Sequence, residues 1–264
     1  MNELQQIQGT SGAIIVIHPT HVSKFAPRGS ISAIGQRIEA QARYMSVLGE
    51  TVCPKVFTTF PGGFTMERCE EPRRGMHLEY AMWRIGQRLQ RDVWKPHKED
   101  IPLTWFEDHW AYIEPRILKY TPHLREYMWN AAQVVRDKTV VSDFSGIIHG
   151  DPTYDNMLMR AGHLLITDPL PPSDGMPKLR AVDIAKAMQS LYGYEIVKYA
   201  GAVPFRKPKD HPLVIGKKIF DLDDREWTLV RYFTAVHFVR LLPYQLDVTR
   251  PLFINLLEQV VADL

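Results

Sequence analysis

The sequence predicts an α+β protein in which a small β-rich part precedes a larger helical part. From residue 13 to 66, short β-branched runs and turn signals surround one amphipathic helix. Beyond Pro72, apolar residues recur at spacings of three and four, which is the helical period. A chain of 264 residues is long enough for two units, each with a core. We therefore expect two domains, residues 1–70 and residues 71–264.

The composition excludes several classes of protein. Lys and Arg number 32 against 30 Asp and Glu, a net charge of +2 that is far from that of a dedicated nucleic-acid binder. No apolar run reaches the roughly 20 residues of a bilayer span, and residues 1–6 lack the features of a secretory signal. The two cysteines, Cys53 and Cys69, are too few for a zinc cluster and are expected to be small core residues. We expect a cytoplasmic protein without nucleic-acid or membrane partners.

The β-rich part contains one helix between its strands. Ser30 is expected to cap the beginning of this helix and Gly49 to follow its end, because apolar residues recur at helical spacing between them. Pro61-Gly62-Gly63 is a typical hairpin turn. The predicted strands are Ala13–Ile17, Val22–Phe25, Val56–Phe60 and Phe64–Met66.

The helical part carries several boundary signals. Thr104 and Glu107 are spaced as a capping box, Pro115 is expected to end or kink the helix they begin, and Thr121 is expected to cap the next helix. A short strand is expected at 147–148 and a hairpin of 156–160 with 163–167. The apolar stripes predict helices around 78–89, 124–135, 182–193, 224–242 and 250–263.

The most informative stretch is the loop from Ile148 to Asn156, followed by Asp168. Phosphoryl transfer needs a carboxylate near the acceptor hydroxyl and hard oxygen ligands for divalent cations. Asp151 can supply the carboxylate. A hairpin places Asn156 and Asp168 at the same end of two paired strands, where both could face one metal ion.

The pattern H-G-D-x-x-x-x-N at 149–156, with Asp168 after a hairpin, resembles the catalytic loop and metal-binding aspartate of the aminoglycoside phosphotransferase-like kinases. These kinases belong with choline and fructosamine kinases to the protein-kinase-like bilobal fold. The resemblance implies that Asp151 is the catalytic base, that His149 braces its loop, and that Asn156 and Asp168 bind Mg²⁺. The alternative is a loop whose aspartates only cap turns and whose histidine only packs.

The resemblance also implies nucleotide-binding parts in the first domain. A glycine-rich turn would cover the phosphates of ATP, Lys24 would contact them, and Glu39 would pair with Lys24. A hinge after the last strand would bind adenine through its backbone. The residues assigned to the turn and the hinge are Gly9, Thr10, Ser11 and Gly12, and Met66, Glu67 and Arg68. Each feature also has an ordinary interpretation: a plain turn, a solvated lysine or a solvent-facing glutamate.

The same resemblance assigns Asp183 to bracing the catalytic loop, although it could equally be the N-cap of a helix near 184. The sequence departs from the family at two places. Pro169-Leu170-Pro171-Pro172 follows Asp168 where a small pair is usual, and Pro152 follows the proposed base. Prolines fix φ and lack an N–H, so the first of these loops should be stiff and unsuited to ordering by phosphorylation.

These features predict an ATP- and Mg²⁺-dependent kinase that phosphorylates a hydroxyl of a small molecule, sugar-like or polyol-like. The mixed charges of the helical part do not form the acidic pocket that a polycationic aminoglycoside needs. Asp155 could add charge near the acceptor or be a solvated turn residue. Trp94, Trp105, Trp110 and Trp129 could stack on a sugar or belong to the core. A protein Ser/Thr kinase and a non-catalytic nucleotide-binding scaffold remain alternatives.

Overall fold

The structure is a computed structural model that describes residues 5–8, 12–27, 31–71, 76–95, 104–171, 176–203 and 211–264. The chain forms two compact units. One contains residues 1–75 and 156–171, and the other contains residues 76–155 and 172–264. The predicted α+β class, with a small antiparallel sheet and a larger helical part, is confirmed. The expected division at residue 70 had assigned the segment 156–171 to the helical domain, whereas in the structure it belongs with the sheet.

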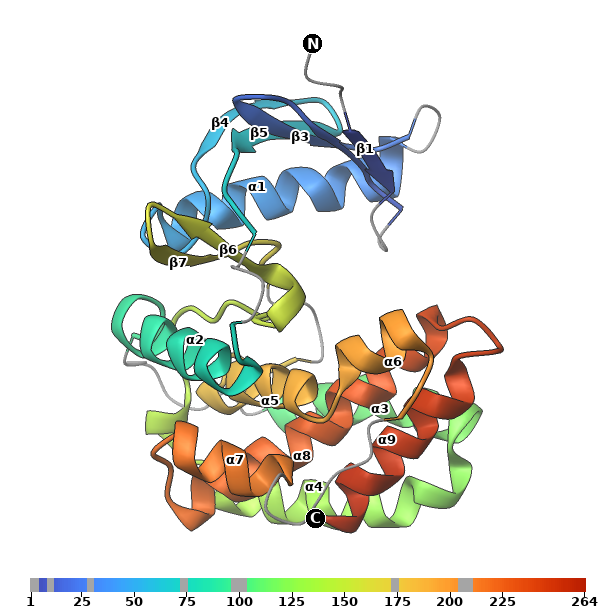
Figure 1. Cartoon of the computed structure of the whole chain (residues 1–264). Coiled ribbons are helices and arrows are strands. Elements are labelled where there is room, and N and C mark those ends of the chain that lie inside the picture. The colour runs from blue at the N-terminus through green and yellow to red at the C-terminus, as the bar shows by residue number, and fades with distance from the viewer. Residues whose placement is uncertain are drawn as a thin grey trace. The chain divides into compact units, whose positions relative to one another are not determined.

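The smaller unit is built on a five-stranded antiparallel sheet of order β1-β2-β3-β5-β4. Figure 1 shows α1 (Gln36–Leu48) lying along this sheet, where it contacts β4 and β5. Its apolar stripe, including Ile38 and Met45, is buried together with Phe64 of the sheet. Burial of these side chains supplies the main stabilisation of the unit. The strands are β1 (Gln5–Gln8), β2 (Ile14–Ile17), β3 (His21–Phe25), β4 (Val56–Phe60) and β5 (Gly63–Glu67).

The edge strand β1 was not predicted, because its polar sequence Gln-Gln-Ile-Gln shows no β-branched alternation. A short π-helix, Ile31–Gly35, precedes α1, and the expected cap Ser30 lies outside the described residues.

A two-stranded hairpin of β6 (Met157–Arg160) and β7 (His163–Ile166) completes the smaller unit. Its turn residues have positive φ angles, 48° at Ala161 and 80° at Gly162, which match the twist of paired strands. Met159 exchanges two backbone hydrogen bonds with Glu70, of 2.7 and 2.9 Å, and the Ile166 N–H donates to the Val52 carbonyl at 2.7 Å. These contacts explain why the hairpin groups with the sheet.

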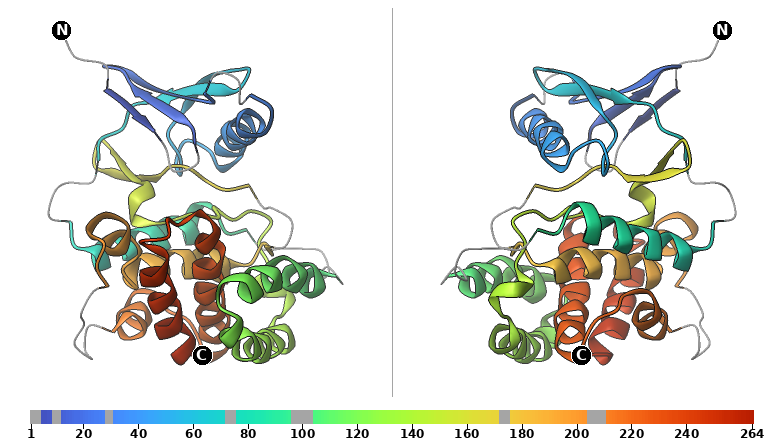
Figure 2. Two further views of the ribbon diagram at one scale, coloured as in Figure 1. Left: turned by 90° about the vertical axis from the view of Figure 1, so that its right-hand side faces the viewer. Right: turned by 90° about the vertical axis from the view of Figure 1, so that its left-hand side faces the viewer.

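The larger unit is helical and is organised around α5 and α8. Every residue of α5 from Ala181 to Leu191 is buried, and α8 packs along it. Figure 2 shows α3 and α4 side by side on one flank of this unit, and both also contact α8. The helices are α2 (Leu78–Asp92), α3 (Trp105–Tyr120), α4 (Arg125–Lys138), α5 (Arg180–Leu191), α6 (Tyr194–Ala200), α7 (Pro212–Ile219), α8 (Asp224–Leu241) and α9 (Arg250–Ala262).

Several local predictions in this unit were wrong. Helix α3 continues through Pro115 to Tyr120, and the Thr104 hydroxyl donates to the Asp108 carboxylate at 2.9 Å instead of capping the backbone. Residues 147–148 form no strand in the structure. Helix α5 begins at Arg180, so Asp183 lies inside its first turn and is not an N-cap.

Three of the four tryptophans considered for sugar stacking pack in an aromatic cluster. Trp110 and Trp129 have ring centroids 4.7 Å apart, and Trp105 meets Phe144 edge-on at 6.1 Å. The fourth, Trp94, lines a separate cavity. In the part of the chain that the structure describes, no helix has the length and apolar character needed to cross a bilayer.

Candidate active site

Lys24 is the centre of a polar group in the smaller unit. It projects from β3 and is only 4% exposed. Its ammonium donates to both carboxylate oxygens of Asp168 at 2.9 Å and to the amide oxygen of Gln41 at 2.8 Å. The Gln41 amide nitrogen in turn donates to the Pro169 carbonyl at 3.1 Å. A buried ammonium with three acceptors is well satisfied, so this group fixes the lysine in one orientation.

The expected partner of Lys24, Glu39, does not pair with it. The Gly62 N–H donates to Glu39 Oε1 at 2.7 Å, and Arg43 approaches the other oxygen at 3.8 Å. Helical geometry explains the correction, because Gln41 falls three residues after the buried Ile38 and shares its face, whereas Glu39 does not. Glu39 therefore accepts a hydrogen bond from the β4–β5 turn. Gln41, and not Glu39, is the residue of α1 that binds the Lys24 ammonium.

Asp168 follows β7 in an unusual backbone conformation, with φ of 54°. Aspartate tolerates this left-handed region better than most residues do. The Thr167 N–H donates to the Asn156 carbonyl at 2.8 Å, so Asn156 lies opposite the residue that precedes Asp168. Both proposed ligand residues are therefore at the same end of the hairpin, as the spacing predicted.

The other residues proposed for nucleotide binding are described in part. Gly9, Thr10 and Ser11 lie outside the described residues. Gly12 has φ of 81°, which favours glycine, and lies between β1 and β2, two residues before β2 begins. In the expected hinge, the Glu67 N–H is occupied by the Lys55 carbonyl at 2.8 Å, while Met66 lies within β5 and Arg68 donates to the His18 carbonyl at 3.0 Å.

In the larger unit, Asp183 holds the loop that contains the H-G-D sequence. Its carboxylate is fully buried and accepts the N–H of His149 at 2.8 Å and that of Gly150 at 2.6 Å. Trp94 Nε1 donates to the same carboxylate at 3.0 Å. Burial raises the pKa of Asp183 to about 6, although the three N–H donors oppose this shift. Gly150 takes the tight turn with φ of 83°.

Asp151 at the end of this turn is paired with a buried lysine. Lys186 on α5 is 7% exposed, and its ammonium lies 3.1 Å from Asp151 Oδ1 and 2.8 Å from Gln189 Oε1. The Asp151 N–H donates to His149 Nδ1 at 3.3 Å, so the buried imidazole supports the backbone of the loop. Asp151 keeps 23% of its side chain exposed, which leaves the carboxylate accessible to another molecule.

Asp155, near the end of the same loop, is not a solvated turn residue. Its carboxylate accepts from Lys198 at 2.7 Å and from the Tyr199 hydroxyl at 2.8 Å, so it anchors the loop to α6. Nearby, the Tyr154 N–H donates to Ser190 Oγ, which donates to Glu195 at 2.6 Å. The loop is thus fixed at both ends.

The cysteines contribute no nucleophile. Cys53 is buried, as expected, and burial raises the pKa of its thiol well above the ordinary value. Cys69 is only half-buried, which corrects the core assignment, and burial together with Glu67 raises its pKa to about 11. Both side chains are thiols in the structure. Because the thiolate is the reactive form, neither side chain suits covalent catalysis near neutral pH.

Sequence reasoning missed the roles of Gln41, Lys186 and Trp94 in these groups. Gln41 could have been found from its place on the apolar stripe of α1. Lys186 lies three residues after Asp183 and therefore on the same helix face, but a lysine in a buried helix is hard to distinguish from a surface residue by pattern alone. Trp94 follows α2 and gives no local signal of its contact with Asp183, 89 residues away.

The oxygen-rich groups suit Mg²⁺ better than a transition metal. Asp168 and Asn156 offer carboxylate and amide oxygens. The Asp168 carboxylate already forms an ion pair with one cationic group, the Lys24 ammonium. Among the described residues, no three His, Cys, Asp or Glu side chains cluster as a metal site. A site of one carboxylate, one amide and the phosphates of a nucleotide is the arrangement that Mg²⁺ commonly uses.

Comparison with solved structures finds this fold in small-molecule kinases. Choline kinase LicA from Streptococcus pneumoniae matches with a TM-score of 0.63 at 13% identity, over 99% of this chain and 94% of that chain. Plasmodium vivax ethanolamine kinase matches at 0.57 and 13% identity, over 99% and 81%. A choline/ethanolamine kinase family protein from Mesorhizobium loti matches at 0.55 and 15% identity, over 100% and 87%. No protein-family model and no curated protein matches the sequence. The protein-kinase-like fold is therefore established, at low sequence identity.

Proposed function

We propose that this protein is an ATP- and Mg²⁺-dependent phosphotransferase that acts on a hydroxyl of a small molecule. The observation that carries the proposal is the Lys24–Asp168 ion pair of 2.9 Å, which joins residues 144 positions apart. In phosphoryl transfer, a lysine of this kind orients the phosphates and an aspartate of this kind binds metal. The kinase fold of the solved neighbours supports this interpretation.

Each group has a role in the proposed reaction. Asp151 accepts the proton of the acceptor hydroxyl while the new O–P bond forms and the bond from the γ-phosphorus to ADP breaks. Lys186 and His149 hold Asp151 and its loop in position, and Lys24 orients the triphosphate. Asn156 and Asp168 would hold Mg²⁺, which neutralises phosphate charge during transfer.

The surroundings of Asp151 favour an uncharged, hydroxyl-rich acceptor over a polycation. Asp151 is paired with Lys186, and Asp155 with Lys198. Burial raises the pKa of Glu195 to about 7, so this carboxyl group is partly protonated near neutral pH. Among these three described carboxyl groups, little net negative charge remains to attract an aminoglycoside, so we propose a sugar or polyol acceptor.

The decisive experiment replaces the proposed base by its isosteric amide. Asp151→Asn should lower kcat by about 10²–10⁴-fold, because general base catalysis is lost. The Kd for Mg·ATP should stay within about threefold, because Asp151 is assigned no contact with the nucleotide. Phosphate transfer to a panel of sugars and polyols, and equilibrium nucleotide binding, are the two measurements.

Asp155→Asn is the matched control, since the same change occurs four residues away in the same loop and removes only an anchor to Lys198 and Tyr199. Equal losses in both variants would contradict the role of Asp151. Transfer to proteins but not to small molecules would instead identify a protein kinase. ATP binding without any turnover would identify a scaffold.

A further inference from the structure

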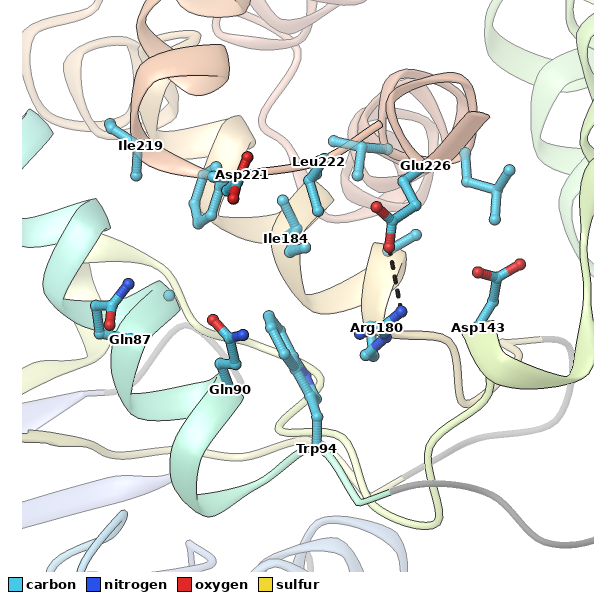
Figure 3. Close-up of a pocket in the computed structure, with 15 residues that line it drawn as sticks. Gln87, Gln90, Trp94, Asp143, Arg180, Ile184, Ile219, Asp221, Leu222 and Glu226 are labelled. Atoms are coloured by element: carbon cyan, nitrogen blue, oxygen red, sulfur yellow. Dashed lines mark hydrogen bonds and ion pairs between the residues drawn. The ribbon is translucent and has the colours of Figure 1, made fainter. Parts of the chain in front are cut away.

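The larger unit contains a cavity of about 120 Å³ that includes none of Lys24, Asp151 and Asp168. It lies among α2, α5, α8 and the segment 219–222 that precedes α8 (Figure 3). Much of its wall is apolar, formed by Trp94, Ile184, Phe220, Leu222, Leu229 and Val230. A cavity on this scale suits a molecule of about one aromatic ring.

The polar groups of the cavity restrict the chemistry of an occupant. Arg180 pairs with Glu226 at 3.1 Å, which Figure 3 marks by a dashed line. The Arg180 Nε is buried, and no residue in the described ranges accepts a hydrogen bond from it. A buried donor without an acceptor costs about 1–3 kcal/mol. The Arg180 side chain is 37% exposed, so a turn of its guanidinium that brings Nε to an acceptor on a ligand in the cavity would relieve that cost.

The charges of the cavity argue against an ionic occupant. Arg180 and Glu226 neutralise each other, and Asp143 is held by Arg225. Asp221 is exposed, so solvent screens its charge. The flat indole of Trp94 projects into the space between Gln90 and Arg180 in the view of Figure 3, where it could stack on a ring.

Trp94 also connects this cavity to the loop that carries Asp151. Its Nε1–H donates to Asp183, the same carboxylate that accepts the N–H groups of His149 and Gly150. A ring stacked on the indole would therefore change the hydrogen bond from Trp94 to Asp183. Because Asp183 also accepts the N–H groups of His149 and Gly150, this change would reach the loop.

We propose that the cavity is a regulatory site for an uncharged, single-ring aromatic molecule with one hydrogen-bond acceptor. Its occupancy acts on the His149–Asp151 loop through Trp94 and Asp183. The binding site is independent of the proposed function, whereas an effect on turnover rests on it.

Pyridine and benzene are suitable probes, because they have the same shape and only pyridine has an acceptor. On the full chain above pH 7, where pyridine is uncharged, pyridine should bind about tenfold more tightly, measured by ligand-detected NMR. Arg180→Lys should remove this preference, since lysine can still pair with Glu226 but lacks the Nε donor. Arg136→Lys on α4, an exposed arginine paired with Asp137, is the matched control and should keep the preference.

The link to the loop is tested by the backbone amide resonances of His149 and Gly150, which pyridine should shift. Trp94→Phe keeps a ring in the wall but removes the Nε1–H, so pyridine should still bind while the two resonances no longer respond. If the protein transfers phosphate, saturating pyridine should change kcat at least twofold in the original chain and not in Trp94→Phe.

Failure of both probes to bind, or equal binding of both, would overturn the proposed site. Binding without any shift at His149 and Gly150 would overturn the regulatory link. If the protein transfers no phosphate, the proposed function fails, but the binding and resonance measurements still decide this inference.

Discussion

Asp183 and Asp168, one from each unit, are held by their surroundings in opposite ways. Asp183 is fully buried and accepts from three neutral N–H groups. Asp168 keeps 33% of its side chain exposed and accepts from the ammonium of Lys24. Neutral donors arranged around a buried carboxylate fix a backbone, because each would be unsatisfied without it. A partly exposed carboxylate that already accepts from an ammonium can also accept another cation.

This difference suggests that two residues of the same type have different roles, a structural role for Asp183 and a ligand-binding role for Asp168. Asp183 shapes the loop on which Asp151 sits and need not contact any substrate. Asp168 has accessible oxygens and a cationic neighbour, as a ligand of a metal–nucleotide complex requires. Substitutions at the two positions should therefore affect different measurements.

Of the substitutions at these two aspartates, Asp168→Asn should have the larger effect on turnover. Asparagine tolerates the left-handed backbone at this position, so the change removes charge with little strain. We expect kcat/KM to fall by about 10²–10³-fold, in line with the loss of one preorganised electrostatic contact, and Mg·ATP binding to weaken with it. Steady-state kinetics and nucleotide titration at several Mg²⁺ concentrations measure both. Normal turnover would remove Asp168 from the proposed metal site.

Asp183→Asn should instead change the pH dependence of stability. The pKa of Asp183 is raised to about 6 in the folded protein, so between pH 4 and pH 6 the folded protein binds more protons than the unfolded chain. The free energy of unfolding therefore falls as pH rises through this range, by about 3 kcal/mol from this group. Urea unfolding from pH 4 to pH 7.5 should show this fall in the original protein relative to the variant. Parallel curves would contradict the burial of a titrating carboxyl.

The comparison also shows what could be predicted from the sequence. The hairpin before Asp168 carries a local pattern, an Ala-Gly turn between two apolar runs, and it forms as expected. The grouping of the hairpin with the sheet was not predictable locally, because it depends on backbone pairing of Met159 with Glu70, 89 positions earlier. Likewise, nothing near Trp94 in sequence indicates its bond to Asp183.

Other errors had signals that were available. Pro115 was expected to end or kink α3, and it does not end it. The packing of Ile113 and Ile117 in the core outweighs the hydrogen bond that the proline lacks. Glu39 was expected to pair with Lys24 because it is negatively charged, although it does not lie on the buried face of the helix. The apolar period of α1 would have selected Gln41.

Gln41→Ala tests this corrected partner of Lys24. The variant loses the 2.8 Å bond to the ammonium and the contact with the Pro169 carbonyl, so Lys24 is held by Asp168 alone among its observed partners. We expect nucleotide affinity to fall about fivefold to tenfold, which corresponds to about 1 kcal/mol. Gln36→Ala, on the exposed beginning of the same helix, is the matched control and should bind nucleotide normally. An unchanged affinity for Gln41→Ala would show that the amide does not position Lys24 for binding.

The smallest functional effect is expected from Glu39→Ala, although the family resemblance would predict one of the largest. In the structure, Glu39 accepts the Gly62 N–H in the β4–β5 turn, so its removal should lower the free energy of unfolding by about 1 kcal/mol. Nucleotide affinity should stay within about twofold, because Lys24 is oriented by other residues. Glu39→Gln keeps an oxygen for Gly62 and should restore the stability. If Glu39→Ala weakened nucleotide binding as much as Gln41→Ala, the lysine would have to change partners when the nucleotide binds, and the ion pair with Asp168 would describe only the ligand-free state.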